Sequence, residues 1–357
     1  MSAPTGLPRL LRGITGRALT LEQHRAVHGP LPELGRRSAA GVLDAIEASG
    51  VRGRGGAHVS AALKLRALAG RRRAVIVANG AESEPASRKD ATLLTQTPHL
   101  VVDGLVAAAV AVGARDGILY VKGESAAYRA AQHALAERRG SDPVAIALAA
   151  APATYVAGQE TAAIAHLSGR PALPSTVPPR PFERGVDGRP TVVSNVETLA
   201  HIGLIVRHGP DWFRAVGWQN QPGTALVTLS GAVARPGVYE TAFHTGLGDL
   251  LEVAGGLTQP AQAILVGGYG GTWLAGRDMP GLLLSEGDPL LRAGSIGAGV
   301  LVVLGADACG LHESAQVLDY MAAQSARQCG PCLHGLHAIG GAFSKLADGT
   351  ADADAEE

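Results

Sequence analysis

The segment Ala74-Val75-Ile76-Val77-Ala78-Asn79-Gly80 decides the fold class of this chain. Its apolar run ends abruptly at an Asn-Gly pair, which is typical of a buried parallel strand that runs into a loop. Two more short apolar runs follow at 117–121 and 144–149, and residues 98–112 fit a buried helix with proline in its first turn. This alternation predicts an α/β domain whose parallel or mixed sheet is covered on both faces.

Helical patterns flank these strands along the chain. They cover residues 38–48, 60–68, 159–167 and 195–206. We therefore expect one α/β domain over residues 37–210, in which the proline-rich stretch 171–190 forms a loop. Residues 1–36 show no clear period and are predicted to form an N-terminal arm.

The pattern changes after residue 210. Residues 223–304 contain short strand-like runs at 225–230, 237–240, 263–266 and 300–304, one short helical pattern at 247–254, and many glycines. They predict a small α+β module. Residues 309–347 are helical by period, and residues 348–357 predict an acidic, unstructured tail.

Composition excludes several classes of function. The 357 residues hold 31 Lys+Arg against 31 Asp+Glu, and no extended basic cluster occurs, which argues against a nucleic-acid partner. No window carries about 18 consecutive apolar residues, and no signal peptide is recognisable. We therefore expect no transmembrane segment and a cytoplasmic protein, either free or peripheral to a membrane complex.

A glycine-rich loop precedes the helical pattern at 60–68. It contains Gly53, Arg54, Gly55 and Gly56, and Lys64 lies two turns further on. Glycines let backbone N–H groups approach an anion, and a helix N-terminus favours negative charge. The alternative is a glycine-rich turn beside a solvated lysine.

Three more polar segments occur where strands end or helices begin. Asn79, Glu82 and Glu84 follow the first strand, at the edge where open α/β sheets place ligands. The other two are the set Tyr155, Gly158 and Glu160 and the pair Asn195 and Thr198. Taken singly, each segment fits a polar helix cap as well as it fits a binding site.

The order and spacing of the four segments are more specific. The series Arg52-Gly-Arg-Gly-Gly-Ala, Asn79-x-x-Glu-x-Glu-Pro, Tyr155-x-x-Gly-x-Glu-Thr and Pro190-Thr-Val-Val-x-Asn-Val-Glu-Thr resembles the family of flavin-bearing NADH-binding (51 kDa or F) subunits of respiratory complex I and their relatives in soluble hydrogenases and formate dehydrogenases. The resemblance runs from about Gly50 to Cys332. It implies a Rossmann-like FMN-binding domain, a ubiquitin-like (β-grasp, SLBB-type) module and a C-terminal helical bundle carrying a [4Fe–4S] cluster.

The resemblance also assigns residues to the site. It implies that FMN contacts Gly53, Arg54, Gly55, Gly56, Lys64, Asn79, Glu82, Tyr155, Gly158, Asn195 and Thr198, and that Glu84 and Glu160 are the catalytic carboxylates. Ala81 stands where the family has an aspartate, so one hydrogen bond of roughly 0.5–1.5 kcal/mol is lost. We expect FMN binding to be retained but weakened.

The nicotinamide side departs further from the family. Val59, Ala67 and Arg180 stand where the family has aromatic residues. Each lost stacking contact costs about 0.5–1.5 kcal/mol beyond its area. We therefore predict weak or absent oxidation of NADH.

The cysteines depart most from the family. Ala326 replaces the first ligand of the cluster motif, Cys329 and Cys332 are the remaining candidate ligands, and the chain ends before the position of the fourth. Two thiolates do not hold a [4Fe–4S] cluster in the usual four-cysteine way, so we expect the cluster to be degenerate or lost. Cys309 is expected to be a buried apolar residue. Cys329-Gly-Pro-Cys332 also matches the dithiol motif of thioredoxin, but a remnant of the cluster motif is the preferred interpretation and a reactive dithiol the open alternative.

These observations favour an FMN-binding electron-transfer oxidoreductase subunit. Its expected partner is a ferredoxin-like iron–sulfur protein or another redox subunit, because a flavin can trade electrons singly or in pairs. The alternatives are an active NADH dehydrogenase subunit and a non-catalytic scaffold or assembly protein.

Overall fold

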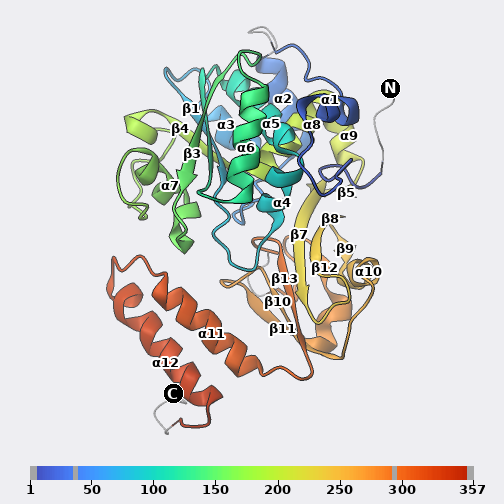
Figure 1. Cartoon of the computed structure of the whole chain (residues 1–357), viewed down its shortest axis with the longest axis vertical. Coiled ribbons are helices and arrows are strands. Elements are labelled where there is room, and N and C mark those ends of the chain that lie inside the picture. The colour runs from blue at the N-terminus through green and yellow to red at the C-terminus, as the bar shows by residue number, and fades with distance from the viewer. Residues whose placement is uncertain (1–5, 35–38, 292–295, 352–357) are drawn as a thin grey trace.

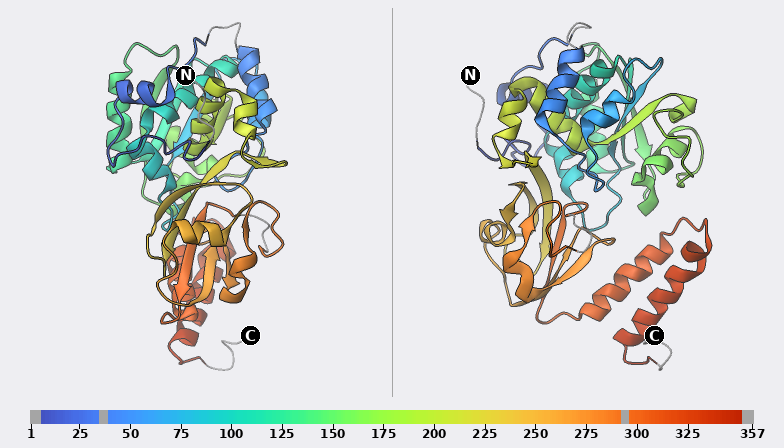
Figure 2. Two further views of the ribbon diagram at one scale, coloured as in Figure 1. Left: turned by 90° about the vertical axis from the view of Figure 1, so that its right-hand side faces the viewer. Right: turned by 180° about the vertical axis from the view of Figure 1, so that it is seen from behind.

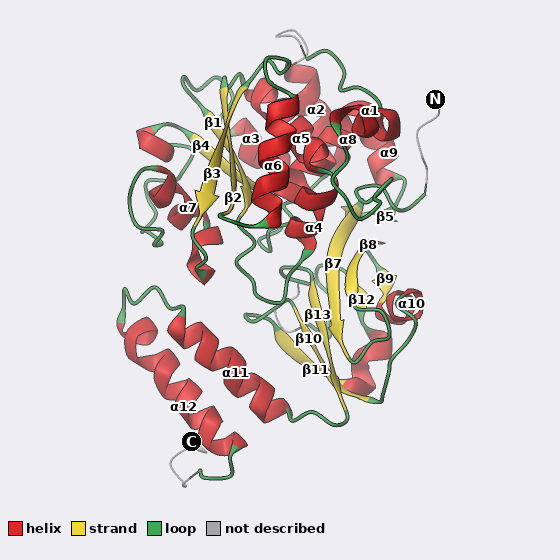
Figure 3. Ribbon diagram, in the orientation of Figure 1, coloured by secondary structure: helices red, strands yellow, loops and turns green. Residues whose placement is uncertain are grey.

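The structure is a computed structural model that describes residues 6–34, 39–291 and 296–351. Three parts follow one another along the chain: an α/β domain, a smaller strand-rich module and a pair of helices (Figures 1 and 3). Residues 352–357 of the predicted acidic tail lie outside the described residues. The predicted class, an α/β domain followed by an α+β module and a helical C-terminal region, is confirmed.

The first domain is built on a four-stranded parallel sheet in the order β3-β2-β1-β4. The strands are β1 (Val75–Gly80), β2 (Asp116–Lys122), β3 (Ala145–Ala151) and β4 (Thr191–Asn195). The first three match the predicted apolar runs. The sequence prediction missed β4, because its short Thr-Val-Val run was assigned to the start of the following helix.

Helices cover both faces of this sheet, because successive residues of a strand point to opposite sides. Ile76 and Ala78 belong to the large core, and Val75 and Val77 to a smaller core that includes residues of α7. The helices of this domain are α1 (Leu21–His28), α2 (Ala39–Ser49), α3 (Ala61–Arg66), α4 (Lys89–Gln96), α5 (Pro98–Val112), α6 (Ala126–Glu137), α7 (Glu160–Leu167), α8 (Val196–His208) and α9 (Pro210–Arg214), with 3₁₀ turns η2 (Tyr155–Gly158) and η3 (Val186–Gly188).

Helices α5 and α8 pack unusually closely in this core. A Cβ atom added to Gly104 of α5 would lie 1.7 Å from the carbonyl oxygen of Leu199 in α8, so only glycine fits there. The contact fixes α8 against the buried helix α5. Because β4 leads directly into α8, the same contact positions the end of β4.

The predicted N-terminal arm is more ordered than its sequence suggested. Helix α1 lies within it and begins with a capping box formed by Thr20 and Gln23. Further upstream, the carboxylate of Glu240 accepts hydrogen bonds from the backbone N–H groups of Arg9, Leu10 and Leu11 at 2.7–3.2 Å. The arm is thus attached to the second module through β8 (Gly237–Ala242), the strand that carries Glu240.

The second module contains a five-stranded mixed sheet in the order β11-β10-β13-β7-β8. Helix α10 and the 3₁₀ turn η4 supply residues to its separate core. Its elements are β5 (Gly217–Trp218), β6 (Gln221–Pro222), β7 (Thr224–Gly231), β8 (Gly237–Ala242), β9 (Thr245–Gly246), α10 (Leu247–Val253), β10 (Ala261–Val266), β11 (Thr272–Ala275), η4 (Gly276–Gly281), β12 (Leu283–Leu284) and β13 (Val300–Gly305).

The C-terminal hairpin consists of α11 (Gly310–Ala323) and α12 (Leu336–Ala347), joined through a π-helical turn at Pro331–Gly335 (η5). It lies beside the second module in Figure 1 and in the right-hand view of Figure 2, and behind that module in the left-hand view of Figure 2. Of its two long helices, only Ala315, Ala322 and Gly340 are buried.

Among the described residues, no single helix has the length and hydropathy of a membrane span. Helices α4 and α5 have that length and hydropathy only when they are counted together, and the two are bent by 97° relative to each other.

Candidate functional site

A cavity of about 620 Å³ opens at the carboxyl ends of β1 and β4. The chain passes from β1 to β2 and β3 on one side of the sheet and returns to place β4 on the other side of β1. Strand order therefore reverses between β1 and β4. This topological switch point is where open α/β sheets bind ligands.

The structure brings most of the predicted site residues together at this cavity. Its lining includes Gly53, Arg54, Gly55, Lys64, Asn79, Glu82, Glu84, Tyr155, Gly158, Glu160, Asn195 and Thr198. Gly56 does not line it, although it lies in the same loop. Cys329 and Cys332 do not line it either.

The glycine-rich loop forms one wall. A Cβ atom at Gly53 or Gly55 would meet no protein atom closer than 3.4 Å, so packing within the protein does not require glycine at these two positions. His58 has φ of 47°, a left-handed conformation in which glycine is favoured. Its imidazole lies 3.0 Å from Glu286 of the second module, and burial together with Arg54 lowers the pKa of His58 to about 4.

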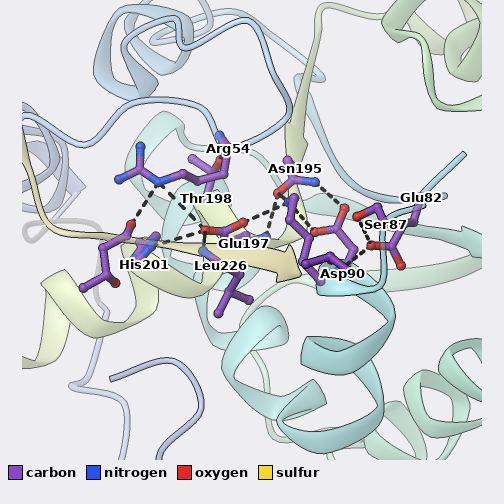
Figure 4. Close-up of polar contacts among 12 residues, drawn as sticks. Arg54, Glu82, Ser87, Asp90, Asn195, Glu197, Thr198, His201 and Leu226 are labelled. Carbon is purple, nitrogen blue, oxygen red and sulfur yellow. Dashed lines mark hydrogen bonds and ion pairs between the residues drawn. The ribbon is translucent and has the colours of Figure 1, made fainter. Parts of the chain in front are cut away.

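Arg54 points away from solvent into a buried charge network (Figure 4). Its backbone N–H donates to the Thr198 hydroxyl at 2.8 Å, and its guanidinium donates to the carbonyl of Thr224 at 3.1 Å. The guanidinium also lies 3.9 Å from Glu197. Burial lowers the pKa of Arg54 to about 10. Arg54 therefore anchors the loop to α8 and to the second module.

Lys89, the first residue of α4, is the second buried cation. Its ammonium group lies 2.8 Å from Asp90 and 2.9 Å from Glu197, and it donates to the side-chain oxygen of Asn195 at 3.3 Å. Burial alone would lower the pKa of Lys89, but the two carboxylates hold it above its ordinary value. The lysine thus stays charged and neutralises two buried acids beside the cavity.

The ends of β1 and β4 are joined by their asparagines. Asn79 and Asn195 are partners in the parallel register. Asn79 donates to the carbonyl of Gly158 at 2.8 Å, and Asn195 caps α8 by accepting from the N–H of Glu197 at 3.0 Å. Both predicted ligand residues therefore also hold the local fold.

Glu82 has a structural role as well. Its carboxylate accepts hydrogen bonds at 2.8 Å from the N–H groups of Asp90 and Ala91 and from the hydroxyl of Ser87, so it caps α4 from outside the helix (Figure 4). Burial and the neighbouring Asp90 raise the pKa of Glu82.

Two of the predicted charged residues face the cavity from its solvent side. Lys64 donates to Glu160 at 3.1 Å, and the side chains of both residues are 37% exposed. This pair is much more open than Arg54 and Lys89. It is therefore free to rearrange around a ligand at low cost.

Glu84 lies between the first domain and the second module. It accepts hydrogen bonds from the backbone N–H of Tyr269 at 3.1 Å and from the hydroxyl of Tyr155 at 3.4 Å. A Cβ atom on Gly268 would lie 2.7 Å from this carboxylate. The loop of the second module that contains Gly268 can therefore approach Glu84 this closely only because it has glycine at that position. Burial raises the pKa of Glu84, and burial followed by Glu84 raises the pKa of Tyr155 to about 12.

Sequence reasoning missed part of the lining. Gly267, Gly270 and Ala298 reach the cavity from the second module. The run Gly267-Gly-Tyr-Gly-Gly271 was a visible signal, because clustered glycines indicate close backbone approach. The buried position of Lys89 had no comparable signal in the sequence.

The cysteines give a mixed result. Cys309 is exposed, so its expected burial was wrong, and the reason is that it precedes α11 at the N-cap position, outside any core. Cys329 is exposed and Cys332 half-buried. Within the described part of the chain, no three His, Cys, Asp or Glu side chains come together as a metal site would require.

The cavity suits a mononucleotide of the FMN type. Its volume lies within the 300–1,000 Å³ common for small-molecule sites. The glycine loop leaves room for ligand atoms where side chains would otherwise stand, and Lys64, Asn79 and Tyr155 supply donors around it. These residues fit the cofactor that the sequence resemblance implied.

Comparison with known proteins agrees with this geometry. Residues 46–204 match the Nuo51 FMN-binding domain, and residues 226–272 match the SLBB domain. The F 2 subunit of the NADH-quinone oxidoreductase of Rhizobium meliloti (strain 1021) is 30% identical over 322 residues, which cover 85% of this chain and 76% of that relative.

Hydrogenase subunits are similar over a smaller share of their length. The alpha subunit of the NAD-reducing hydrogenase HoxS of Cupriavidus necator is 35% identical over 246 residues, covering 64% of this chain and 40% of that subunit. The crystal structure of an NAD⁺-reducing [NiFe]-hydrogenase in the H₂-reduced state superimposes with a TM-score of 0.80 at 30% identity. The match covers 90% of this chain and 56% of the hydrogenase chain, so this chain spans about half of that protein. The chain belongs to the family of F subunits of NADH-quinone oxidoreductase, as a divergent member with an FMN-binding domain, an SLBB domain and a helical C-terminal region.

Proposed function

We propose that this chain binds FMN in the cavity at the β1/β4 switch point and works as an electron-transfer oxidoreductase subunit. Its redox partner is an iron–sulfur protein of the ferredoxin class. The observation that carries the proposal is the cavity with a glycine-rich wall, lined also by Lys64, Asn79 and Tyr155, in the part of the chain that matches the FMN-binding domain. FMN supplies a centre that exchanges electrons singly or in pairs.

The chain's own residues divide the work of binding. Gly53 and Gly55 let the ligand approach the backbone of the loop closely, and Lys64 offers an exposed positive charge. Asn79 and Tyr155 orient the ligand from the sheet end and the opposite wall. Arg54 and Lys89 are buried and interact with Glu197 inside the protein, so we assign the neutralisation of the ligand's negative charge to the more exposed Lys64.

NADH is proposed to be a poor electron donor. Val59 lines the cavity without a ring to stack on a nicotinamide, and Ala67 and Arg180 are absent from the lining. Glu84, the carboxylate assigned to the nicotinamide side, already accepts hydrogen bonds from Tyr155 and Tyr269. These contacts come in part from the loop 267–271 of the second module, which we call the SLBB loop. A dinucleotide would have to displace this loop to reach Glu84.

Two carboxylates keep their proposed catalytic roles. Glu84 is the candidate to hold a proton beside the electron donor, because burial raises its pKa. Glu160 is proposed to orient Lys64 toward the ligand through their contact at 3.1 Å.

The test is flavin titration of the purified full-length chain. FMN fluorescence should be quenched with one site per chain, and riboflavin should bind at least tenfold more weakly because it lacks the phosphate. The loaded protein should be bleached rapidly by chemically reduced ferredoxin and only slowly by NADH.

The outcomes separate the three candidate functions. A protein that stays colourless after incubation with FMN would leave the scaffold interpretation. Bleaching by NADH within the mixing time would identify an active NADH dehydrogenase subunit and refute the proposed roles of Val59 and the SLBB loop.

A further inference from the structure

The turn between α11 and α12 places two cysteines in close register. The N–H of Leu333 donates to the carbonyl of Cys329 at 2.9 Å, and Gly330 between the cysteines has helical φ and ψ of −52° and −51°. Cys329 and Cys332 are thus three residues apart on one helical turn. Residues at this spacing have Cβ atoms about 5–6 Å apart, and a disulfide needs about 3.5–4.5 Å, so a backbone shift of roughly 1–2 Å within this turn brings the two sulfur atoms into bonding range.

This turn is oriented by local contacts and is accessible to solvent. The Ser325 hydroxyl donates to the carbonyl of Cys332 at 2.7 Å, and Pro331 restricts the backbone between the cysteines. Cys329 is exposed and Cys332 half-buried, so a reagent or a protein can reach the pair. Cys309 lies at the opposite end of the 14-residue helix α11, about 21 Å away by helical rise, and cannot pair with either.

The turn is also attached to the wall of the cavity. Gln324 accepts a hydrogen bond from the N–H of Tyr155 at 3.0 Å, and Gln328 donates to the carbonyl of Pro174 at 2.9 Å. The ring of Tyr320 packs edge-on against Tyr155 and Tyr269. The cysteines therefore follow directly after a segment that contacts the site.

We propose that Cys329 and Cys332 form a redox-active dithiol that exchanges two electrons with a disulfide of a partner protein. One thiolate attacks a sulfur of the partner disulfide, forming a mixed disulfide and releasing one partner thiol. The other cysteine then attacks the mixed disulfide, so that the Cys329–Cys332 bond closes and the second partner thiol leaves. Two electrons and two protons pass to the partner, and the reverse exchange with a dithiol restores the pair.

The proposal goes beyond FMN binding and is tested independently of it. Full-length protein is equilibrated without oxygen in glutathione buffers of rising oxidised-to-reduced ratio, quenched with acid and alkylated with a maleimide mass tag. We expect both thiols to be lost in one step as an intramolecular Cys329–Cys332 disulfide, identified by peptide mapping. Cys329→Ser and Cys332→Ser should abolish this step, while the matched control Cys309→Ser retains it.

A second readout uses the reverse chemistry. With dithiothreitol as the reductant, the wild-type chain should accelerate reduction of insulin disulfides at least tenfold more than Cys329→Ser or Cys332→Ser, and Cys309→Ser should match the wild type. Thermal unfolding of each variant establishes that it is folded. Thiols that stay free or become only glutathionylated in oxidised glutathione would overturn the proposal. Stoichiometric iron and sulfide lost on either substitution would also overturn it, by assigning the cysteines to a cluster shared between copies.

Discussion

The cavity and the C-terminal turn differ in how far their candidate site residues are tied into the fold. At the cavity, Arg54, Asn195 and Thr198 hold the protein together through buried hydrogen bonds and also line the site. At the turn, Cys329 and Cys332 lie outside every core. A residue used by both fold and ligand is costly to change, whereas a residue used only by a ligand is free to change when that ligand is lost. The comparison predicts that substitutions of buried, paired residues at the cavity destabilise the fold and that substitutions at the turn do not.

The largest effect is expected from the buried cation of the cavity. Lys89→Met leaves Asp90 without its lysine partner and Glu197 with only Arg54 at 3.9 Å, which should cost roughly 3–5 kcal/mol of unfolding free energy and abolish FMN binding. Lys345→Met, on the exposed side of α12, should change stability by less than about 0.5 kcal/mol. Urea unfolding followed by tryptophan fluorescence measures both. Equal losses would break the distinction between the two regions.

Acidification should also destabilise the first domain. Burial is the main cause that lowers the pKa of His28 to about 3 and the pKa of His99 to about 4, and the neighbouring His24 is the second. The charged residues around these histidines are Asp103, Glu137, Arg138 and Arg207. The unfolded chain takes up protons near pH 6.5 and the folded chain does not, so stability is present above this pH and falls as pH drops toward 4. The loss is at most about 1.4 kcal/mol per pH unit for each histidine.

Urea unfolding between pH 7.5 and 5 checks this dependence. His28→Gln should flatten it, and the matched change His337→Gln in exposed α12 should leave it unaltered. A pH profile that is unchanged in His28→Gln would contradict the assignment.

A smaller effect separates ligand binding from folding. Gly55→Ala adds a Cβ that meets Asn195 only at 3.4 Å, so the midpoint of thermal unfolding should stay within a few degrees. The same methyl group enters the space of the ligand and should weaken FMN binding about tenfold, or about 1.4 kcal/mol. Gly41→Ala, where nothing lies within 4 Å, is the matched control and should bind FMN normally.

The smallest effect is expected where the hairpin meets the cavity. Tyr320→Ala removes the ring contacts with Tyr155 and Tyr269, each worth about 0.5–1.5 kcal/mol. Global stability should hardly change, but amide hydrogen exchange across 324–335 should rise. Gln316→Ala, on the same helix and exposed, should leave exchange in this segment as it is. Unchanged exchange in Tyr320→Ala would show that another contact holds the turn.

The elements that could be predicted from the sequence are those with a distinctive composition. Apolar runs predicted β1, β2 and β3, and a proline start with a long apolar stretch predicted α5 with its observed bounds. It missed β4, which is too short to separate from α8, and α1, whose buried His24 and His28 resemble surface residues in a sequence.

For the site, the order of the four polar segments predicted which parts of the chain line the cavity, but it did not predict which contacts each side chain makes. Glu82 was predicted to contact the cofactor and caps α4, a contact that depends on the left-handed turn at its own φ of 39°. The contribution of Gly267 and Gly270 depends on how two domains pack, which local patterns do not encode.

The attachment of the N-terminal arm by Glu240 has a consequence for how this chain varies. Glu240 accepts hydrogen bonds from three consecutive backbone N–H groups, and these bonds would survive a change of side chain at any position that is not made proline. Packing constrains the same positions, because Leu10 and Leu11 belong to the core of the first domain and Arg9 lies over the ring of Trp212. Variation at positions 9–11 is therefore limited by the core of the first domain, and not by the carboxylate of the second module that receives the arm.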